Sequence, residues 1–212
     1  MLRRALLLPV LVLATPVLAE EIRCEGVFAA DSSAERVAEV FGKDNVVTGE
    51  TPGPEGSTYI ATTVFPNDPA RTMIFGWWDE EAHRDLANVT LPAGDSIAGL
   101  KPGLTVKEVE ALNGEPFIMT GFWWDYGGYA GFQSGALSSI AGGCIVSVSF
   151  SPDESIITDG MNTDPVSGDI EVPSGEPLLE TLNVRVESVS IGYPFPGMEE
   201  EMVEEPAEDT RG

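Results

Sequence analysis

The sequence predicts an α+β fold made of two related halves, each a short helix packed on an antiparallel sheet. Two observations support this prediction. A capped, amphipathic helical pattern occurs twice, 72 positions apart, and each copy precedes several short apolar segments that Gly and Pro separate. We expect the first half to span residues 20–96 and the second half to span residues 97–193.

The clearer helix is expected over residues 105–114. Thr105 and Glu108 have the spacing of a capping box, in which the hydroxyl accepts from an unpaired amide and the carboxylate accepts from the amide of the cap residue. Gly114 ends the helix, because glycine tolerates the left-handed conformation, and Pro116 prevents its continuation. A helix this short is not stable alone, so it must pack on a sheet.

The earlier helix is expected over residues 33–42, with a less regular capping box between Ser32 and Glu35. Its apolar positions, which include Val40, match those of the later helix, which include Leu112, at the same offset. A constant offset is typical of an internal repeat. A chance match between two short amphipathic patterns is the alternative.

Short apolar segments indicate the strands. In the first half they cover residues 57–65, 71–78 and 88–91, and in the second half residues 116–123, 129–133 and 144–151. Residues 152–178 are rich in Pro, Gly, Asp and Ser and are expected to form a long loop. The alternation of Leu182, Val184 and Val186 with polar residues predicts one more strand.

The two termini have different roles. Residues 1–19 have a basic start, an apolar stretch and a small-residue cleavage pattern, so they indicate a secretory signal with Glu20 as the mature N-terminus. A membrane anchor is the alternative, but the apolar stretch is shorter than the ~20 residues that a span needs. Residues 194–212 are too acidic and too poor in apolar residues to fold, and are expected to be disordered. We therefore expect a periplasmic or secreted protein with no integral membrane segment after cleavage.

The chain is strongly acidic, with a formal net charge of −24. Nucleic acids and anionic lipid surfaces are therefore poor partners, because both would be repelled. Basic proteins, cationic peptides and divalent ions are compatible with this charge. The simplest interpretation of the acidic charge is that it keeps the protein soluble.

The chain has two cysteines, Cys24 and Cys144. In an oxidising compartment the default expectation is one disulfide between them. The alternative is a reactive thiol at Cys144, which would need a nearby base, and His83 is the one histidine in the sequence.

Aromatic residues gather between positions 117 and 132 and again at the tryptophan pair at positions 77 and 78. Neighbouring residues of a strand face opposite sides, so one tryptophan of each pair is expected to face outward. Exposed rings on a sheet can stack on sugars or anchor a protein partner. Filling the seam between two thin halves is the alternative role. The candidate binding residues are Trp77, Trp123, Trp124, Asp125, Tyr126 and Tyr129.

Asp125 lies among these aromatic residues in the sequence, and an alternative role for it is that of an acid catalyst. Hydrolysis of a glycosidic bond usually needs a second carboxylate, which Asp79, Glu80 or Glu81 could supply. Capping of the turn that follows Asp125 is the simpler role. The sequence has no nucleophile elbow, phosphate loop, dinucleotide fingerprint or histidine-rich metal pattern, so we expect no metal site and no cofactor.

The segment from Gly103 to Pro116 resembles a recurring pattern of envelope proteins, with glycine and threonine before a helix and Gly-x-Pro after it. It is similar to the β-lactamase-inhibitory proteins and to the small lipoprotein of the outer-membrane β-barrel assembly machinery. The segment from Asn113 to Gly128 resembles a set of exported bacterial proteins of unknown function. The resemblance implies a short helix on an antiparallel sheet, repeated in tandem in the inhibitory proteins. No lipid-attachment box is present and the cysteines span both halves, so no functional residue is carried over.

The leading hypothesis from the sequence is a non-enzymatic binding protein that contacts a protein or an envelope polymer through an aromatic surface. The alternative is a hydrolase of envelope saccharides that uses Asp125 and a second carboxylate. A third interpretation is a purely structural, acid-rich envelope protein.

Overall fold

The computed structural model describes residues 21–197 and has three α-helices and nine strands within them. The helices are α1 (Ala34–Phe41), α2 (Val106–Asn113) and α3 (Pro177–Thr181). The strands are β1 (Val46–Pro52), β2 (Thr58–Val64), β3 (Met73–Asp79), β4 (Arg84–Thr90), β5 (Ile118–Thr120), β6 (Tyr129–Gly131), β7 (Ile145–Ser151), β8 (Glu171–Pro173) and β9 (Arg185–Gly192). The expected secretory signal lies outside the described residues, as does nearly all of the expected acidic tail. Among residues 21–197, no helix combines the length and the apolar character that crossing a membrane requires.

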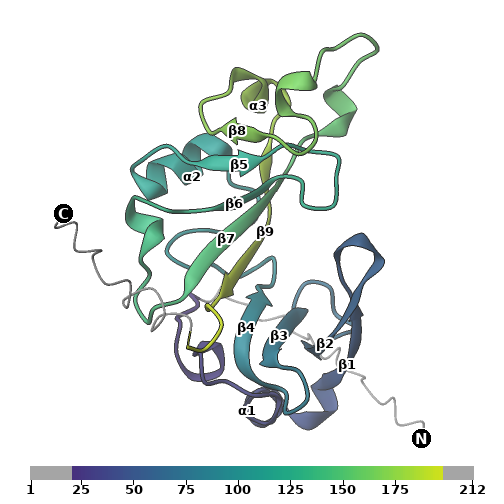
Figure 1. The fold of residues 1–212 in the computed structure, drawn as a ribbon, viewed down its shortest axis with the longest axis vertical. Coiled ribbons are helices and arrows are strands. Elements are labelled where there is room, and N and C mark those ends of the chain that lie inside the picture. The colour runs from purple at the N-terminus through teal and green to yellow at the C-terminus, as the bar shows by residue number, and fades with distance from the viewer. Residues whose placement is uncertain (1–20, 198–212) are drawn as a thin grey trace, which may run out of the picture.

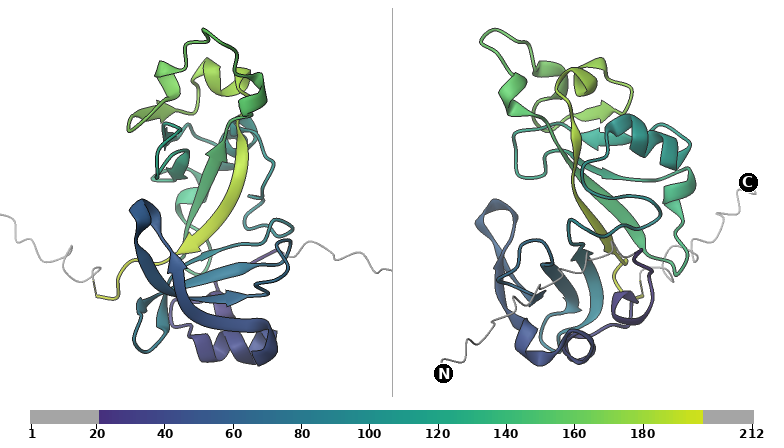
Figure 2. Two further views of the ribbon diagram at one scale, coloured as in Figure 1. Left: turned by 90° about the vertical axis from the view of Figure 1, so that its right-hand side faces the viewer. Right: turned by 180° about the vertical axis from the view of Figure 1, so that it is seen from behind.

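Seven strands form one antiparallel sheet in the order β1-β2-β3-β4-β9-β7-β6, and β5 pairs with β8 in a small second sheet. The first half contributes β1 to β4, and the pairing of β4 with β9 joins it to the second half. The two halves lie end to end along the long axis of the molecule (Figure 1). Viewed from the side, β9 runs from the second half to the junction, where its last residues pair with β4 (Figure 2). The predicted α+β class is confirmed.

A helix followed by three strands occurs twice along the chain, as α1-β1-β2-β3 and α2-β5-β6-β7, but the pairing differs, because β1 pairs with β2 whereas β5 pairs with β8. The helices Ala34–Phe41 and Val106–Asn113 begin and end 72 positions apart, as do the strands Met73–Asp79 and Ile145–Ser151. The correspondence then ends, because β8 and α3 lie between β7 and β9. An origin of the two halves by duplication stays a prediction.

The caps of α1 and α2 differ in detail. The predicted capping box of α2 is confirmed: the Thr105 hydroxyl accepts from the Glu108 amide at 3.2 Å, and the Glu108 carboxylate accepts from the Thr105 amide at 2.8 Å. In α1 the hydroxyl of Ser33 accepts from the Arg36 amide at 3.3 Å. The predicted box between Ser32 and Glu35 is wrong, because Ser32 is fully buried and its hydroxyl has no hydrogen-bond partner.

The apolar stripes of these helices are narrower than the sequence predicts. Val37 and Val109 are fully buried, whereas Val40 is 61% exposed and Leu112 is 37% exposed. Val106 of α2 is buried as well, and Phe41 in the last turn of α1 is half-buried and packs against the core. Each helix therefore contacts the core through more than one side chain, whereas Val40 and Leu112 lie at the surface.

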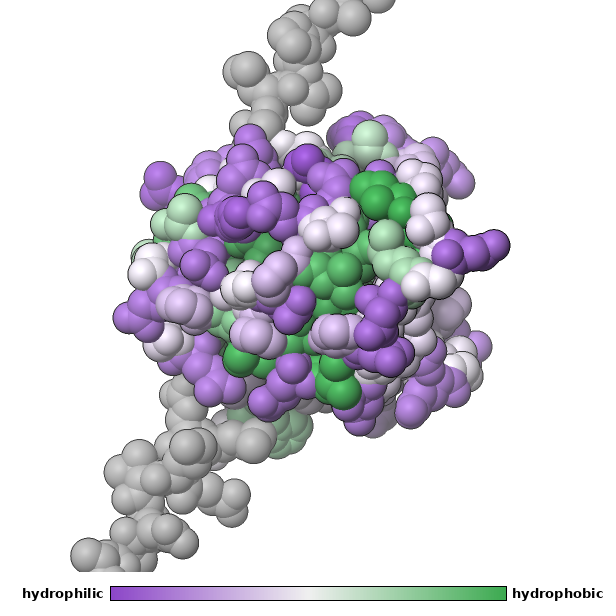
Figure 3. Space-filling model, turned by 90° about the horizontal axis from the view of Figure 1, so that it is seen from above, coloured by the Kyte–Doolittle hydropathy of each residue, from purple (hydrophilic) through white to green (hydrophobic). Residues whose placement is uncertain are grey.

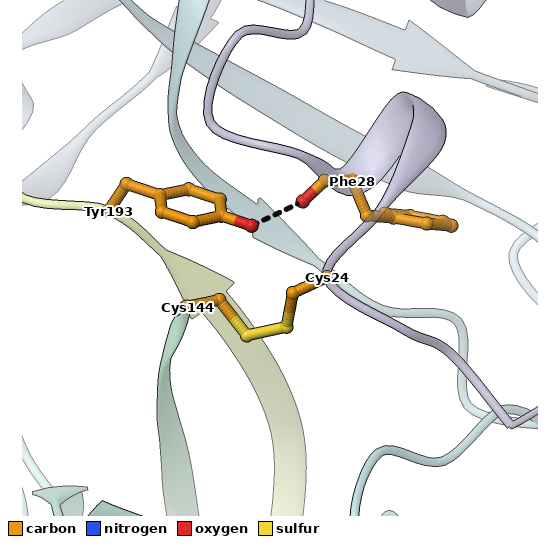
Figure 4. The surroundings of a disulfide bond; sticks show 4 residues. All are labelled: Cys24, Phe28, Cys144 and Tyr193. Carbon is orange, nitrogen blue, oxygen red and sulfur yellow. Dashed lines mark hydrogen bonds between the residues drawn. A yellow bond between two sulfur atoms is a disulfide. The ribbon is translucent and has the colours of Figure 1, made fainter. Parts of the chain in front are cut away.

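A single hydrophobic core runs through both halves and includes Val89 of β4 and Ile191 of β9, which pair at the junction. The expected disulfide is present between Cys24 and Cys144, whose Cα atoms are 5.8 Å apart. It ties the N-terminal segment to the start of β7. Beside it, the Tyr193 hydroxyl donates to the Phe28 carbonyl at 2.8 Å, so β9 is held to the same segment (Figure 4). Cys144 is therefore not a free reactive thiol.

Residues 152–178 contain more structure than the expected loop. They include β8, two short 3₁₀ turns and the start of α3. The strand expected around residues 182–186 begins later, at Arg185, although Leu182, Val184 and Val186 are all buried as their alternation predicts.

Candidate binding site

The candidate site is the segment of residues 121–128 between β5 and β6, which we call the aromatic loop. Thr120 closes its base: the hydroxyl donates to the Tyr126 carbonyl and accepts from the Tyr129 amide at 2.9 Å. The Gly128 amide donates to the Gly121 carbonyl at 3.1 Å. The two ends of the loop are therefore held together before any side chain of the loop contributes.

Phe122 anchors the aromatic loop to the second half. Its ring is 3% exposed, its amide donates to the Val166 carbonyl at 2.7 Å, and its carbonyl accepts from the Gly168 amide at 2.8 Å. Gly128 has a φ of 71°, and a Cβ there would collide with the Phe150 carbonyl. The close fit at Phe122 and Gly128 gives the loop one defined conformation.

Trp123 lies at the surface, with its ring edge-on to the buried Phe122 ring at 5.8 Å. Its φ is 64°, in the left-handed region that large side chains rarely adopt, and its side chain is 45% exposed. The indole N–H donates to a Glu154 carboxylate oxygen at 3.2 Å. The expectation that Trp123 and Trp124 alternate on a strand is wrong, because β5 ends at Thr120 and both tryptophans lie in the loop.

The other aromatic candidates of this region also lie at or near the surface. Trp124 is half-buried, with its indole N–H on the Gly121 carbonyl at 3.0 Å and its ring edge-on to Tyr126 at 5.4 Å. Tyr126 is 45% exposed, and Tyr129, on β6, is 49% exposed. The aromatic loop and β6 thus bring four of the sequence-predicted binding residues together with Asp125.

Trp77 belongs to the core, so it does not contribute to an exposed surface. It is 4% exposed, and its ring stacks on Phe75 at 6.0 Å. Its neighbour Trp78 is 41% exposed and donates to the Tyr193 carbonyl at 3.0 Å. The prediction that this pair faces opposite sides is confirmed, and Trp78 is the outer member.

Asp125 is exposed, and its carboxylate makes no hydrogen bond or ion pair with any other residue between 21 and 197. The expected capping role is wrong, since the turn is closed by the Gly127 amide on the Trp124 carbonyl at 2.9 Å. Asp79 serves its own turn: hydrogen bonds from the Ala82 amide and then from Arg84 lower the pKa of its carboxyl group. Asp79 therefore has a local structural role.

The stretch of sequence that contains the aromatic loop carries charge of one sign. Residues 108–184 include twelve Asp or Glu residues and no Lys, Arg or His. Among them is Asp153, whose pKa is lowered by hydrogen bonds from the Ser155 hydroxyl and amide. The net charge of the whole chain does not reveal that acidic and basic residues are segregated in this way. The order of the charged residues along the chain does reveal it. Within residues 21–197, no group of three or more His, Cys, Asp or Glu side chains is placed to hold a metal ion.

Comparison of the chain with models of protein families, with curated proteins and with solved structures gives no match. The suggested kinship with exported envelope proteins stays a prediction. The function is therefore argued from the site itself.

Proposed function

We propose that this chain is an exported, non-enzymatic binding protein whose aromatic loop contacts a protein or an envelope polymer. Export is supported by the signal-like residues 1–19 and by the disulfide between Cys24 and Cys144, because disulfides persist in oxidising compartments. The binding role is supported by the geometry of the aromatic loop.

Trp123 carries the proposal. Trp123 has a positive φ, and although its ring meets the buried Phe122 ring edge-on at 5.8 Å, the residue is still 45% exposed and so available to a partner. Conformations of this kind persist where the surrounding structure holds them and are enriched at functional sites. The Glu154 carboxylate restricts the indole at 3.2 Å, so little side-chain freedom remains to be lost on binding. Exposed tryptophan and tyrosine rings are the side chains most often found at the energetic centres of interfaces.

The proposal is tested by affinity capture from the exported fraction of the source organism with three forms of the protein. These are the wild type, Trp123→Ala and a control, Val40→Ala, which removes an even more exposed apolar side chain from α1. We expect the partner to be recovered by the wild type and the control. Recovery by Trp123→Ala should fall by about tenfold or more, as for an interface hot spot.

Digestion of the captured material with a protease or with polysaccharide hydrolases separates a protein partner from an envelope polymer. Equal recovery by the wild type and Trp123→Ala would contradict the role of the aromatic loop. Release of soluble saccharides from isolated envelope polymer, lost in Asp125→Asn, would contradict the non-enzymatic assignment.

A further inference from the structure

A pocket lies between α2 and α3 in the second half. Its volume is about 390 Å³, which is within the usual range for small-molecule sites. One wall is the first part of α2, and the other is the chain from Ser174 to Val184, which includes α3. The connection from β7 to its partner β9 spans residues 152–184, whereas the one from β3 to its partner β4 spans residues 80–83. The longer connection therefore gives the second half a wall facing α2 that the first half lacks.

The inner surface of the pocket is apolar. Val106 of α2, Leu179 of α3 and Val184, which lies just before β9, are all buried and line it. They can cover a short hydrocarbon chain, because moving CH₂ groups out of water is favourable. The end of the molecule that carries α3 shows apolar residues between hydrophilic ones (Figure 3). An apolar lining with a few polar groups is typical of small-molecule sites.

An ion pair joins the two walls at the rim of the pocket. The Lys107 Nζ atom lies 2.6 Å from a Glu180 carboxylate oxygen, and both side chains are largely exposed. Their opposite charges neutralise each other, so Lys107 does not offset the other negative charges of the pocket. Because the pair runs from α2 to α3, it also narrows the opening between them.

Two further carboxylates line the pocket and are half-buried, those of Glu110 and Glu176. Glu110 Oε2 accepts from the hydroxyl of the buried Ser174, and Glu176 Oε1 accepts from the Leu178 amide at 3.0 Å. The second oxygen of each carboxylate has no hydrogen-bond partner among residues 21–197. An ionised carboxylate accepts through both of its oxygens, so each keeps room for another donor. A single cation that donates hydrogen bonds is complementary to both groups.

We infer that this pocket binds a small primary alkylamine in its protonated form. The ammonium group donates to the free oxygens of Glu110 and Glu176. The alkyl chain lies on Val106, Leu179 and Val184. A free amine fits better than a lysine side chain of a partner protein, because the ion pair at the rim leaves little room for an attached polypeptide. The pocket shares no residue with the aromatic loop, so the inference is independent of the proposed function.

The probe is n-pentylammonium chloride, titrated at constant ionic strength into the isotope-labelled mature chain and followed by NMR of the Val and Leu methyl groups. We expect saturable shifts at Val106, Leu179 and Val184. Pentanol lacks the charge and ammonium chloride lacks the alkyl chain, so each should bind at least about tenfold more weakly. No saturable shift at these residues, or binding of pentanol with equal affinity, would overturn the inference.

Lysine blocked at both its amino and carboxyl ends tests the other source of an alkylammonium group. It carries the same ammonium group and alkyl chain as the probe, with two amide groups attached. We expect it to bind more weakly than pentylammonium, because the ion pair at the rim obstructs the added groups. Equal or tighter binding of the blocked lysine would overturn the assignment of the pocket to a free amine.

Matched variants test the two carboxylates. Glu110→Gln and Glu176→Gln keep an oxygen acceptor and nearly the same shape but remove the charge. Each should weaken pentylammonium binding by about tenfold, because a charge-assisted hydrogen bond is lost. Glu39→Gln makes the same change at an exposed position of α1 and should leave binding unaltered. Amide spectra of the variants outside the pocket check that each one folds, and equal effects of all three substitutions would contradict the assigned site.

Discussion

The indole N–H of Trp77 donates to the hydroxyl of Thr62 at 3.0 Å inside the core, and the same hydroxyl lies 2.9 Å from that of Thr48. Thr62 is fully buried and faces the same side of the sheet as Trp77. This contact satisfies the one polar atom of a large buried ring. This hydrogen bond explains how Trp77 of β3 can be buried, because its indole N–H finds an acceptor on the neighbouring strand β2.

Replacing Thr62 by Val should destabilise the protein. The change keeps the shape of the side chain but leaves the Trp77 N–H buried without an acceptor, which costs about 1–3 kcal/mol. Urea unfolding monitored by circular dichroism measures the difference. Thr63→Val, on the opposite face of β2, is the control and should change stability by less than about 0.5 kcal/mol. Equal effects of the two substitutions would show that the hydrogen bond to Trp77 contributes little.

Local signals made much of the fold predictable. The capping box of Thr105 and Glu108 and the glycine at position 114 each act within one helical turn, so sequence spacing alone identifies α2. Alternation likewise predicted that Trp77 and Trp78 face opposite sides. It could not predict which ring is inside, because that depends on the pairing of β3 with strands from elsewhere in the chain.

The conformation of the aromatic loop was not predictable for the same reason. The end of β5 and the outward turn at Trp123 depend on hydrogen bonds between Phe122 and residues Val166 and Gly168. These partners lie in a segment that composition alone describes as a loop. The pairing of β5 with β8 is equally non-local. The sequence therefore indicated which aromatic residues gather, and tertiary contacts decided how they are presented.

Removing the disulfide should destabilise the fold strongly. Cys24 and Cys144 are 120 positions apart, and in the chain-entropy model closing a loop of this length contributes about 4–5 kcal/mol. The double variant Cys24→Ser/Cys144→Ser should therefore unfold at a much lower guanidinium concentration than the wild type. The wild type in a strong reductant should behave like this variant. Identical midpoints for the oxidised wild type and the variant would contradict the stabilising role.

Alanine substitutions of the neighbouring residues Ser32 and Ser33, at the start of α1, should change the stability of the protein in opposite directions. Ser33→Ala removes the cap of the Arg36 amide and should cost about 1 kcal/mol. Ser32→Ala removes a buried hydroxyl without a partner and should stabilise the protein by about 1 kcal/mol, since the desolvation of that hydroxyl is avoided. The backbone carbonyl of Ser32, which accepts from the Asp85 amide at 2.9 Å, is unchanged by the substitution. Thermal unfolding of both variants provides the comparison, and destabilisation by Ser32→Ala would show that its hydroxyl has a stabilising contact.

The capping box of α2 should make part of the stability depend on pH. The pKa of the Glu108 carboxyl group is lowered from its ordinary value of 4.5, first by the hydrogen bond from the Thr105 amide and then by the one from the Thr105 hydroxyl. Because the folded-state pKa is the lower one, this contribution is fully present above pH 4.5 and is lost as the pH falls through the folded-state value.

A double-mutant cycle of Thr105→Ala and Glu108→Ala isolates this contribution from the helix propensity of alanine. The coupling between the two residues, measured by urea unfolding, should be favourable at neutral pH. It should shrink steadily below pH 4.5, because a protonated carboxyl group is a weaker acceptor for the Thr105 amide. A coupling that stays constant down to the lowest pH at which the protein folds would mean that the ionised form of Glu108 is not what caps the helix.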